Sequence, residues 1–246
     1  MKIWAHRGCS QRYPENTITA FAKAIDIPRL TGIELDIQMT KDGEIVVLHD
    51  ERVDRTTDGM GYVKDFLYTQ LRELKIETDE SKKEKIPSIH EVLDLLQVKM
   101  KEGMFLNIEL KNSSIFYDGM EEKILELIAK RGLQKQTVYS SFSLKSMQVL
   151  RKLDPDVSVG ILDTQISECL YKKNCISMAE DMRIALHPFR GGLDLPKDQF
   201  DGQVVRAWFI GHLYPERPTG TRLDLESLEE RGITDVFLNE PELYLK

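Results

Sequence analysis

The chain has no long apolar stretch and few cysteines, and these absences exclude several classes of protein. No run within its 246 residues approaches the length needed to cross a lipid bilayer. The N-terminus lacks the basic region and apolar segment of a signal peptide, so a cytoplasmic location is expected. Cys9, Cys169 and Cys175 show neither zinc-site spacing nor a disulfide framework, which fits a reducing compartment.

Basic residues are in deficit, with 34 Lys and Arg against 41 Asp and Glu and a formal net charge of −7. This balance argues against a nucleic-acid partner. The chain also lacks a basic amphipathic helix, so we expect no membrane insertion. A small phosphate ester is not excluded as a partner, because only the local field at its site matters. Nothing in the sequence indicates an oligomeric state.

Strand-like runs alternate with helical patterns along a chain whose composition, 41% hydrophobic and 30% charged, is that of a globular protein. Strands are expected at 2–5, 32–37, 45–48, 104–110, 137–140, 157–162, 183–186, 204–208 and 235–238. Helices are expected at 17–25 (with Asn16 as N-cap), 88–101, 118–130, 144–153 and 165–182, weakly at 196–202, and at 223–231. This alternation predicts a parallel sheet.

Nine strands are one too many for an eightfold barrel, but the run at 45–48 is predicted to form an antiparallel hairpin with 32–37. Removing it leaves eight βα units, which predict an α/β fold with a single (β/α)8 TIM barrel domain over residues 1–246. The longest irregular stretch, roughly 50–87, follows the hairpin and contains the charged run 79–85. Long loops in compact domains are usually functional or mobile, so we expect an inserted cap beside the site.

The pair Asp42-Gly43 between two β-type runs is a strong signal for a tight hairpin turn. With these two residues as the turn, Asp36 faces His49 across the hairpin. An imidazole would then lie beside a carboxylate, with Glu34 two residues further along the same face. Folding alone does not require this arrangement, so the pattern indicates a functional site.

Charged, polar and aromatic side chains gather where the predicted strands end, and in TIM barrels the active site lies at that carboxyl face. They are His6 and Arg7 after the first strand, Glu34 and Asp36 on the second, Glu109 and Lys111 after the cap, and Trp208 near the end of the chain. Trp208 could belong to the core or form an apolar wall for a ligand, and we favour the wall. His187 ends a strand at the same rim, where the sequence alone favours a structural role.

Together these motifs resemble the glycerophosphodiester phosphodiesterase family, over nearly the whole chain and in the family's order. The resemblance is carried by His6-Arg7-Gly8, Pro14-Glu15-Asn16-Thr17, Glu34-x-Asp36, the Asp42-Gly43 hairpin closing on His49-Asp50, and Asn107-Ile108-Glu109-Leu110-Lys111. Weaker pieces are Ile86-Pro87-Ser88, Ser140-Ser141-Phe142 and the strand ending at Trp208. One departure concerns the substrate pocket: Phe209-Ile210-Gly211 follows the tryptophan where the family usually has a Thr-Val-Asn type sequence.

The resemblance implies a barrel with a small insertion after the hairpin, and metal-dependent cleavage of glycerophosphodiesters to sn-glycerol 3-phosphate and an alcohol. It implies Glu34, Asp36 and Glu109 as metal ligands, His6 and His49 as acid–base groups, and Arg7 and Lys111 as phosphate contacts. An all-oxygen ligand set favours Mg²⁺, Ca²⁺ or Mn²⁺ over zinc. The expected substrates are small deacylated phospholipid esters such as glycerophosphocholine, with the Trp208 wall against their glycerol or head group.

Two other functions stay open at this point. A phospholipase D-like enzyme on the same fold would act on intact lipids and need an exposed apolar rim, against which the charged run 79–85 argues. A non-catalytic barrel that only binds phosphate esters would need neither histidine, whereas this chain has both. Taken singly, the motifs also have structural readings, such as a surface ion pair for Glu109 and Lys111.

Overall fold

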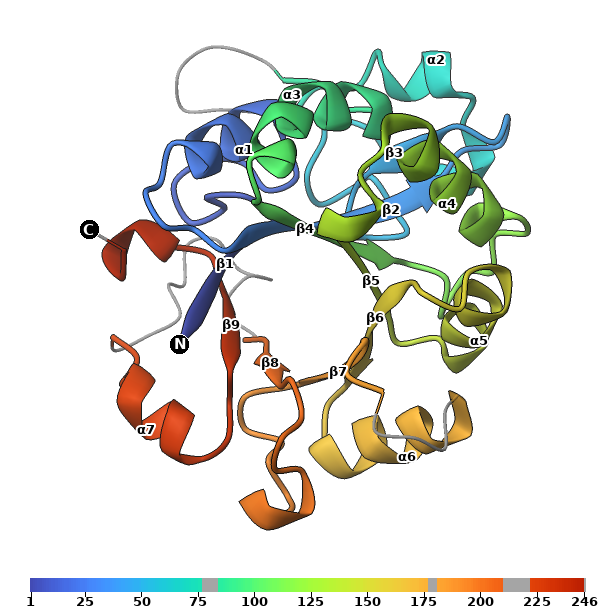
Figure 1. Ribbon diagram of the computed structural model, residues 1–246. Helices are drawn as coiled ribbons and strands as arrows, with labels where there is room; N and C mark the ends of the chain where they lie inside the picture. The colour runs from blue at the N-terminus through green and yellow to red at the C-terminus, as the bar shows by residue number, and fades with distance from the viewer. Residues whose placement is uncertain (77–83, 177–180, 210–221, 246) are drawn as a thin grey trace.

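The structure, a computed structural model, describes residues 1–76, 84–176, 181–209 and 222–245, and all nine predicted strands form within them. Their bounds are β1 Lys2–His6, β2 Gly32–Met39, β3 Ile45–Val47, β4 Phe105–Leu110, β5 Thr137–Ser141, β6 Ser158–Asp163, β7 Ile184–Pro188, β8 Arg206–Ala207 and β9 Asp235–Leu238. Eight of them are parallel, in the order β7-β6-β5-β4-β2-β1-β9-β8. Isolated bridges Leu186–Val205 and Phe189–Trp208 join the two ends, so the sheet closes into the predicted (β/α)8 barrel (Figure 1).

Helices surround the sheet (Figure 1). They are α1 Ile18–Ile25, α2 Tyr68–Leu71, α3 Ile89–Lys101, α4 Met120–Arg131, α5 Leu144–Leu153, α6 Ile166–Ile176 and α7 Leu225–Glu230. Between β7 and β8 the described residues form only the 3-10 turn Lys197–Gln199, in place of the weak helix expected at 196–202. The predicted helix end at Met182 is wrong, because Asp181 and Met182 are not helical and residues 177–180 lie outside the described part.

Two helix starts show how local sequence acts. Helix α3 begins with a capping box: the Ser88 hydroxyl accepts from the Glu91 N–H, and the Glu91 carboxylate accepts from the Ser88 N–H. The predicted N-cap of α1 is wrong by one residue. Thr17 is the cap, because its hydroxyl accepts from the Ala20 N–H, whereas Asn16 has a left-handed φ of 58° and its amide turns toward the barrel.

The hairpin forms, but its register differs by one residue from the prediction. Ile37 pairs with Val47, and the Asp36 carbonyl accepts from the Leu48 N–H, so Asp36 does not face His49. The turn contains three residues, 41–43, instead of two. Gly43 stands at φ 83°, a left-handed conformation that glycine adopts without steric cost and that three-residue hairpin loops require.

His49 nevertheless reaches the barrel rim, by a different route from the predicted alternation. Strand β3 ends at Val47, and residues 49 and 50 form a bend. The buried Gln38 amide donates to the His49 carbonyl (3.0 Å), and the Tyr117 hydroxyl donates to the Gln38 carbonyl oxygen (2.7 Å). This pair of hydrogen bonds fixes the bend that presents the imidazole.

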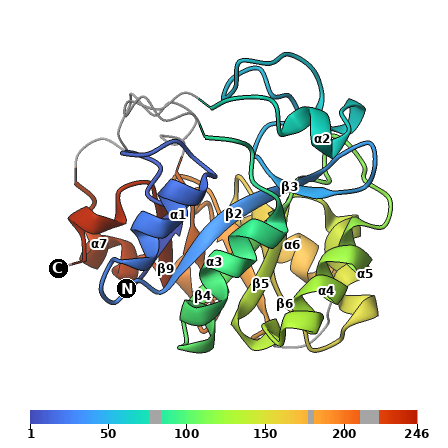
Figure 2. The same ribbon diagram turned by 90° about the horizontal axis from the view of Figure 1, so that it is seen from above.

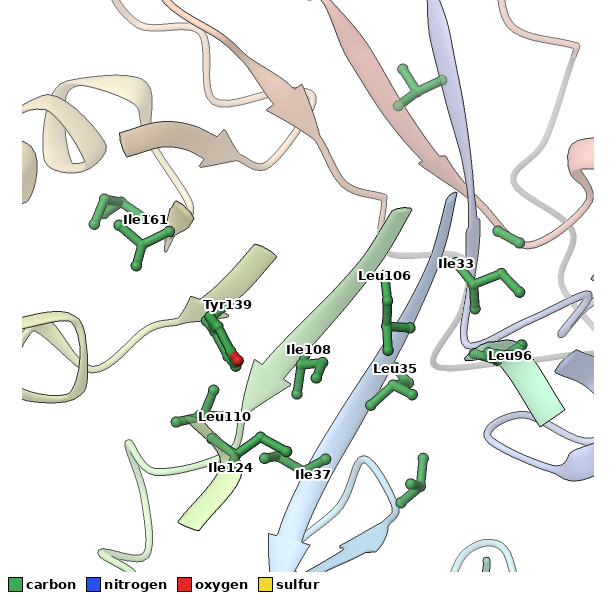
Figure 3. Close-up of a cluster of buried hydrophobic side chains, with 14 of the residues drawn as sticks. Ile33, Leu35, Ile37, Leu96, Leu106, Ile108, Leu110, Ile124, Tyr139 and Ile161 are labelled. Atoms are coloured by element: carbon green, nitrogen blue, oxygen red, sulfur yellow. The ribbon is translucent and has the colours of Figure 1, made fainter. Parts of the chain in front are cut away.

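The main core lies between the sheet and the helices, and it determines which side chains point into the barrel. Figure 3 shows Ile33, Leu35 and Ile37 of β2 beside Leu106, Ile108 and Leu110 of β4, with Leu96 and Ile124 from the covering helices. Successive strand residues point to opposite faces. The residues between these apolar ones, which include Glu34, Asp36, Asn107 and Glu109, therefore point inward.

The segment after the hairpin has an apolar cluster of its own. The cluster consists of Val46, Leu48, Val53, Val63, Leu71, Ile76 and Ile86. Figure 2 shows α2 and its flanking loops at one end of the barrel, next to β3. Most of the charged run expected at 79–85 lies outside the described residues. Among the described helices, none is both long and apolar enough to span a membrane.

Candidate active site

Strand register brings the predicted acidic residues and the first histidine together. His6 of β1 is the register partner of Glu34 on β2, and Asp36 is the partner of Glu109 on β4. All four point inward at the carboxyl ends of three neighbouring strands. This is the end of a TIM barrel at which active sites form.

Glu34, Asp36 and Glu109 form a cluster whose composition fits a divalent metal. One carboxylate oxygen from each lies within 4.8 Å of the others, and all three residues are buried. Glu34 Oε1 and Asp36 Oδ1 are buried without a hydrogen-bond partner. Unpartnered buried acceptors are costly, and a dication would satisfy both while removing the repulsion among the carboxylates. The all-oxygen set suits a hard cation.

The pKa values of the two β2 carboxyls move apart. Burial, followed by the neighbouring Asp36 and Glu109 charges, raises the pKa of Glu34 well above its usual range. Burial alone would also raise the pKa of Asp36, but the Arg7 guanidinium and further nearby cationic groups lower it to about 2. Of the two carboxyls, Asp36 is therefore the more readily ionised and Glu34 the more readily protonated.

His6 is held as a neutral imidazole. Its Nδ1 lies 2.8 Å from Asn239 Oδ1, which can only accept, so Nδ1 carries the proton. Its Nε2 lies 3.7 Å from Glu34 Oε2. Burial and then the charge of Arg7 lower the pKa of His6 well below its usual value. The lone pair on Nε2 is the group that His6 offers to chemistry.

His49 is oriented by charges on both of its nitrogens. Its Nδ1 lies 2.6 Å from Asp50 Oδ1, and its Nε2 accepts from Lys111 Nζ at 3.1 Å. Lys111 also donates to Glu109 Oε1 (2.8 Å). Burial opposes the charge on Lys111, but Glu109 and Asp36 outweigh it and raise its pKa. Lys111 thus links the second histidine to the acidic cluster.

Behind the histidines, one arginine joins the two loops that carry them. Arg55 donates to Asp50 (2.6 Å) and, through two nitrogens, to Glu15 (2.9 and 2.7 Å). Glu15 in turn accepts from Arg7 Nη1 (2.8 Å), and Arg7 Nε lies 3.2 Å from Asp36 Oδ2. Arg7 is buried in a left-handed backbone conformation, with φ 54°. A continuous chain of ion pairs therefore runs from Asp50 to the acidic cluster.

These groups open onto a cavity of about 180 Å³. Its lining residues are His6, Arg7, Glu34, His49, Asn107, Glu109, Ser140, Phe142, Leu162, His187, Trp208 and Phe237. Of the predicted site residues, Asp36 and Lys111 do not line it but contact Arg7 and Glu109, which do. A wider groove of about 530 Å³ lies at the opposite end of the strands, beside residues 25–31 and 99–105, and contains none of the predicted groups.

Trp208 stands in the apolar part of the cavity wall and also packs against the buried cluster of Trp4, Val138 and Phe237. Its ring centroid is 6.0 Å from that of Phe142 and 5.1 Å from that of Phe189. Its indole N–H donates to the His187 carbonyl (3.1 Å). Phe209-Ile210-Gly211 follows Trp208 and differs from the family's usual sequence. Phe209 is buried beneath Arg190, while Ile210 and Gly211 lie outside the described residues.

Several supporting residues were not predicted. Asn239 orients His6, Asn16 donates to Asp36 Oδ2 (2.9 Å), and Arg55 bridges Asp50 and Glu15. Asp50 and Glu15 carried a local signal, since they lie inside the motifs His49-Asp50 and Pro14–Thr17. Arg55 and Asn239 lie outside these motifs, and their contacts with Glu15 and His6 join residues that are distant in sequence.

A sequence profile of the glycerophosphoryl diester phosphodiesterase family matches residues 6–175. The chain belongs to this family. Glycerophosphodiester phosphodiesterases of Caldanaerobacter subterraneus subsp. tengcongensis and Bacillus altitudinis are 41% and 40% identical to it. The first alignment covers 98% of this chain and 94% of the relative, the second 100% and 97%.

Solved structures of the family share the barrel. The glycerophosphodiester phosphodiesterase of Thermotoga maritima superposes with a TM-score of 0.70 at 26% identity, covering 98% of this chain and 96% of the other. A phosphodiesterase of Oleispira antarctica, solved in complex with the product sn-glycerol-3-phosphate, superposes with a TM-score of 0.75 at 24% identity, covering 99% and 94%. The TIM barrel of this chain is thus the fold of the family.

Proposed function

We propose that the protein hydrolyses glycerophosphodiesters to sn-glycerol 3-phosphate and an alcohol, and that it needs a divalent metal to do so. The observation that carries this proposal is the meeting of the oxygen-ligand cluster and two oriented histidines in one cavity. The names of the relatives, and the product bound to the Oleispira antarctica enzyme, support the substrate class.

Glu34, Asp36 and Glu109 would hold the metal, with Mg²⁺, Ca²⁺ or Mn²⁺ as the candidates. When bound, such an ion supplies positive charge to the phosphate oxygens, on which negative charge builds during displacement. Arg7 and Lys111 would add to this field from the two sides of the cluster. Arg7 also has a supporting task, because its guanidinium keeps Asp36 ionised.

The surroundings of the histidines suggest different tasks for them. His6 is a neutral imidazole with its proton on Nδ1 and a lone pair on Nε2, the form in which an imidazole removes a proton from a nucleophile. His49 has the Asp50 carboxylate 2.6 Å from Nδ1, which stabilises the protonated ring that donates to a leaving alkoxide. We therefore assign His6 as the base and His49 as the acid.

The rest of the site favours a small substrate. Trp208 and Phe142 form an apolar wall opposite the charged residues, suited to the carbon skeleton of one half of the diester.

We propose a single barrel domain over residues 1–246, with residues 50–87 as a cap beside the site. We also propose a cytoplasmic location, which the three free cysteines fit.

The test is an assay of sn-glycerol 3-phosphate release from glycerophosphocholine, glycerophosphoethanolamine and glycerophosphoglycerol. Each substrate is measured with Mg²⁺, Ca²⁺ or Mn²⁺ and again with excess chelator. We expect release with at least one metal and its loss with chelator. Absence of product from every diester under every metal would overturn the proposal.

A further inference from the structure

Two buried polar groups in the cavity lie outside the set used for acid–base chemistry and metal binding. Asn107 Oδ1 and His187 Nδ1 are buried and have no hydrogen-bond partner. Both residues line the same cavity of about 180 Å³. Because folded proteins pair nearly all of their buried polar atoms, two unpaired ones beside one cavity point to a ligand.

The proton of His187 is placed by its neighbours. Its Nε2 accepts from Arg206 Nη1 (3.2 Å), and Arg206 is held by Asp235 (3.3 Å) and by the face of the Trp4 ring (5.2 Å to the centroid). Complete burial lowers the pKa of His187 well below its usual value, so the ring is neutral. Since Nε2 accepts, the single ring proton lies on Nδ1, which is therefore a donor.

The barrel makes room for this ring. A Cβ atom added at Gly160 would lie 2.1 to 2.6 Å from three atoms of the His187 imidazole. The space exists only because β6 has a glycine at the position that faces the histidine. The hydrogen bond from Arg206 Nη1 accounts for an acceptor at Nε2 of this ring. It does not account for the buried Nδ1, which stays unpaired at an energetic cost.

Asn107 provides the complementary group. Its amide nitrogen donates to Ser140 Oγ (2.8 Å), which fixes the side chain with Oδ1 as the unpaired end. Asn107 is the register partner of Glu34, so it lies beside the acidic cluster on the neighbouring strand. The cavity therefore presents one uncharged acceptor and one uncharged donor.

We propose that Asn107 and His187 form a hydroxyl-binding subsite that takes the glycerol half of the diester, an inference that rests on the proposed function. A hydroxyl can donate or accept, so the hydroxyls of a glycerol half can satisfy both groups. A phosphate would meet the acceptor Asn107 Oδ1, and a quaternary ammonium group would leave both atoms unpaired. The cavity is also smaller than the 300 to 1,000 Å³ of typical ligand pockets, about the size for one half of the substrate.

The kinetic test compares two diesters that share a choline group. Glycerophosphocholine contains the glycerol hydroxyls, and propyl phosphocholine lacks them. We expect His187→Leu to raise KM for glycerophosphocholine about tenfold or more, with propyl phosphocholine affected less than about twofold. His187→Asn keeps an N–H near the Nδ1 position, so we expect it to restore most of the loss. Asn107→Ala tests the acceptor separately and keeps the proposal testable where His187→Leu does not fold.

A binding measurement separates this subsite from the proposed activity. Calorimetry with sn-glycerol 3-phosphate and with inorganic phosphate needs no turnover. The variants should weaken binding of the first about tenfold and leave the second and the affinity for Mg²⁺ unchanged. The subsite would be overturned by equal losses of affinity for both anions or by a shift in metal affinity. It would also be overturned by an equal rise in KM for glycerophosphocholine and propyl phosphocholine, which share the choline group. Absence of product from wild-type protein would instead overturn the proposed function, and the calorimetry would still decide the subsite.

Discussion

Glu34 and Asp36 are two residues apart on β2, yet their surroundings give them opposite tasks. Asp36 has Arg7 3.2 Å away and a pKa of about 2, so its charge is already compensated. Glu34 accepts from the Arg7 backbone N–H, but burial and the two neighbouring carboxylates raise its pKa. Protein groups thus compensate part of the negative charge of the cluster, and a bound cation would compensate the rest.

Glu109→Gln should weaken metal binding, because it removes a charged ligand from this cluster. We expect the metal concentration for half-maximal activity to rise about tenfold or more. The measurement is activity against Mg²⁺, Ca²⁺ and Mn²⁺ concentration, with the exposed Glu122→Gln on α4 as the matched control. Full turnover of wild-type protein in excess chelator would contradict the metal requirement itself.

His6→Ala and His49→Ala should each lower kcat on the order of a hundredfold or more, the usual contribution of a positioned acid or base. Both side chains line the cavity, so near-normal folding is expected. Turnover with circular dichroism of each variant checks both points. If both variants kept turnover within a few-fold of wild type, the acid–base assignment would be wrong.

His187 should make stability depend on pH. Its folded pKa lies well below the ordinary value of 6.5, so the unfolded chain binds the extra proton as pH falls through 6.5. The contribution of this histidine is therefore intact above that value and lost below it, at up to about 1.4 kcal/mol per pH unit. Urea unfolding at pH 7.5 and 5.5 should show a smaller pH dependence for His187→Asn than for wild type. An equal dependence would contradict a neutral buried ring.

At the scale of elements, the segment after the hairpin is attached to the site through its charges. Arg55 holds Asp50, the partner of His49, and Glu15, the partner of Arg7. The guanidinium spans two carboxylates on separate loops, which a lysine cannot reproduce. Arg55 is thus a positioning residue that acts through His49 and Arg7.

Arg55→Lys should lower kcat about tenfold or more while KM changes little, because the histidine is misaligned and the cavity is kept. The alkaline limb of the pH–rate profile, which reports the general acid, should shift as well, and a purely structural role would not cause this shift. Arg52→Lys is the matched control, since Arg52 pairs with the exposed Asp54 and stacks on Tyr62, away from the cavity-lining residues. Equal effects from the two variants would rule out a special role for Arg55.

The strands and most helices could be predicted because their signals are local. Apolar alternation, the Ser88 capping box and Gly132 after α4 each act within a few residues. The hairpin register could not be predicted from the sequence, because Asp42-Gly43 fits both a two-residue and a three-residue loop. Likewise, the motifs predicted which side chains meet at the rim, but Asn239 is 233 positions from His6 and only the closed barrel brings them together.

At the scale of the whole molecule, net charge and cavity size point to a water-soluble substrate. The chain carries a net charge of −7, which disfavours adsorption to anionic bilayers, and the cavity of about 180 Å³ has no room for acyl chains. We expect glycerophosphocholine to be cleaved faster than the corresponding diacyl lipid under the same metal conditions. Faster cleavage of the diacyl lipid would favour the phospholipase D-like alternative.

The barrel closes between β7 and β8 with fewer backbone pairings than it has between its other strands. Strand β8 has two residues, and the backbone on either side of it pairs with the β7 region through isolated bridges, whereas β1, β2 and β4 pair over three to six residues each. Amide hydrogens along this seam should exchange with solvent before those of the other strands. Trp208 and His187 border the seam, and the acidic cluster lies on the opposite side of the barrel. Substitutions near β7 and β8 should therefore change substrate selectivity while the acidic cluster and the two histidines keep their alignment.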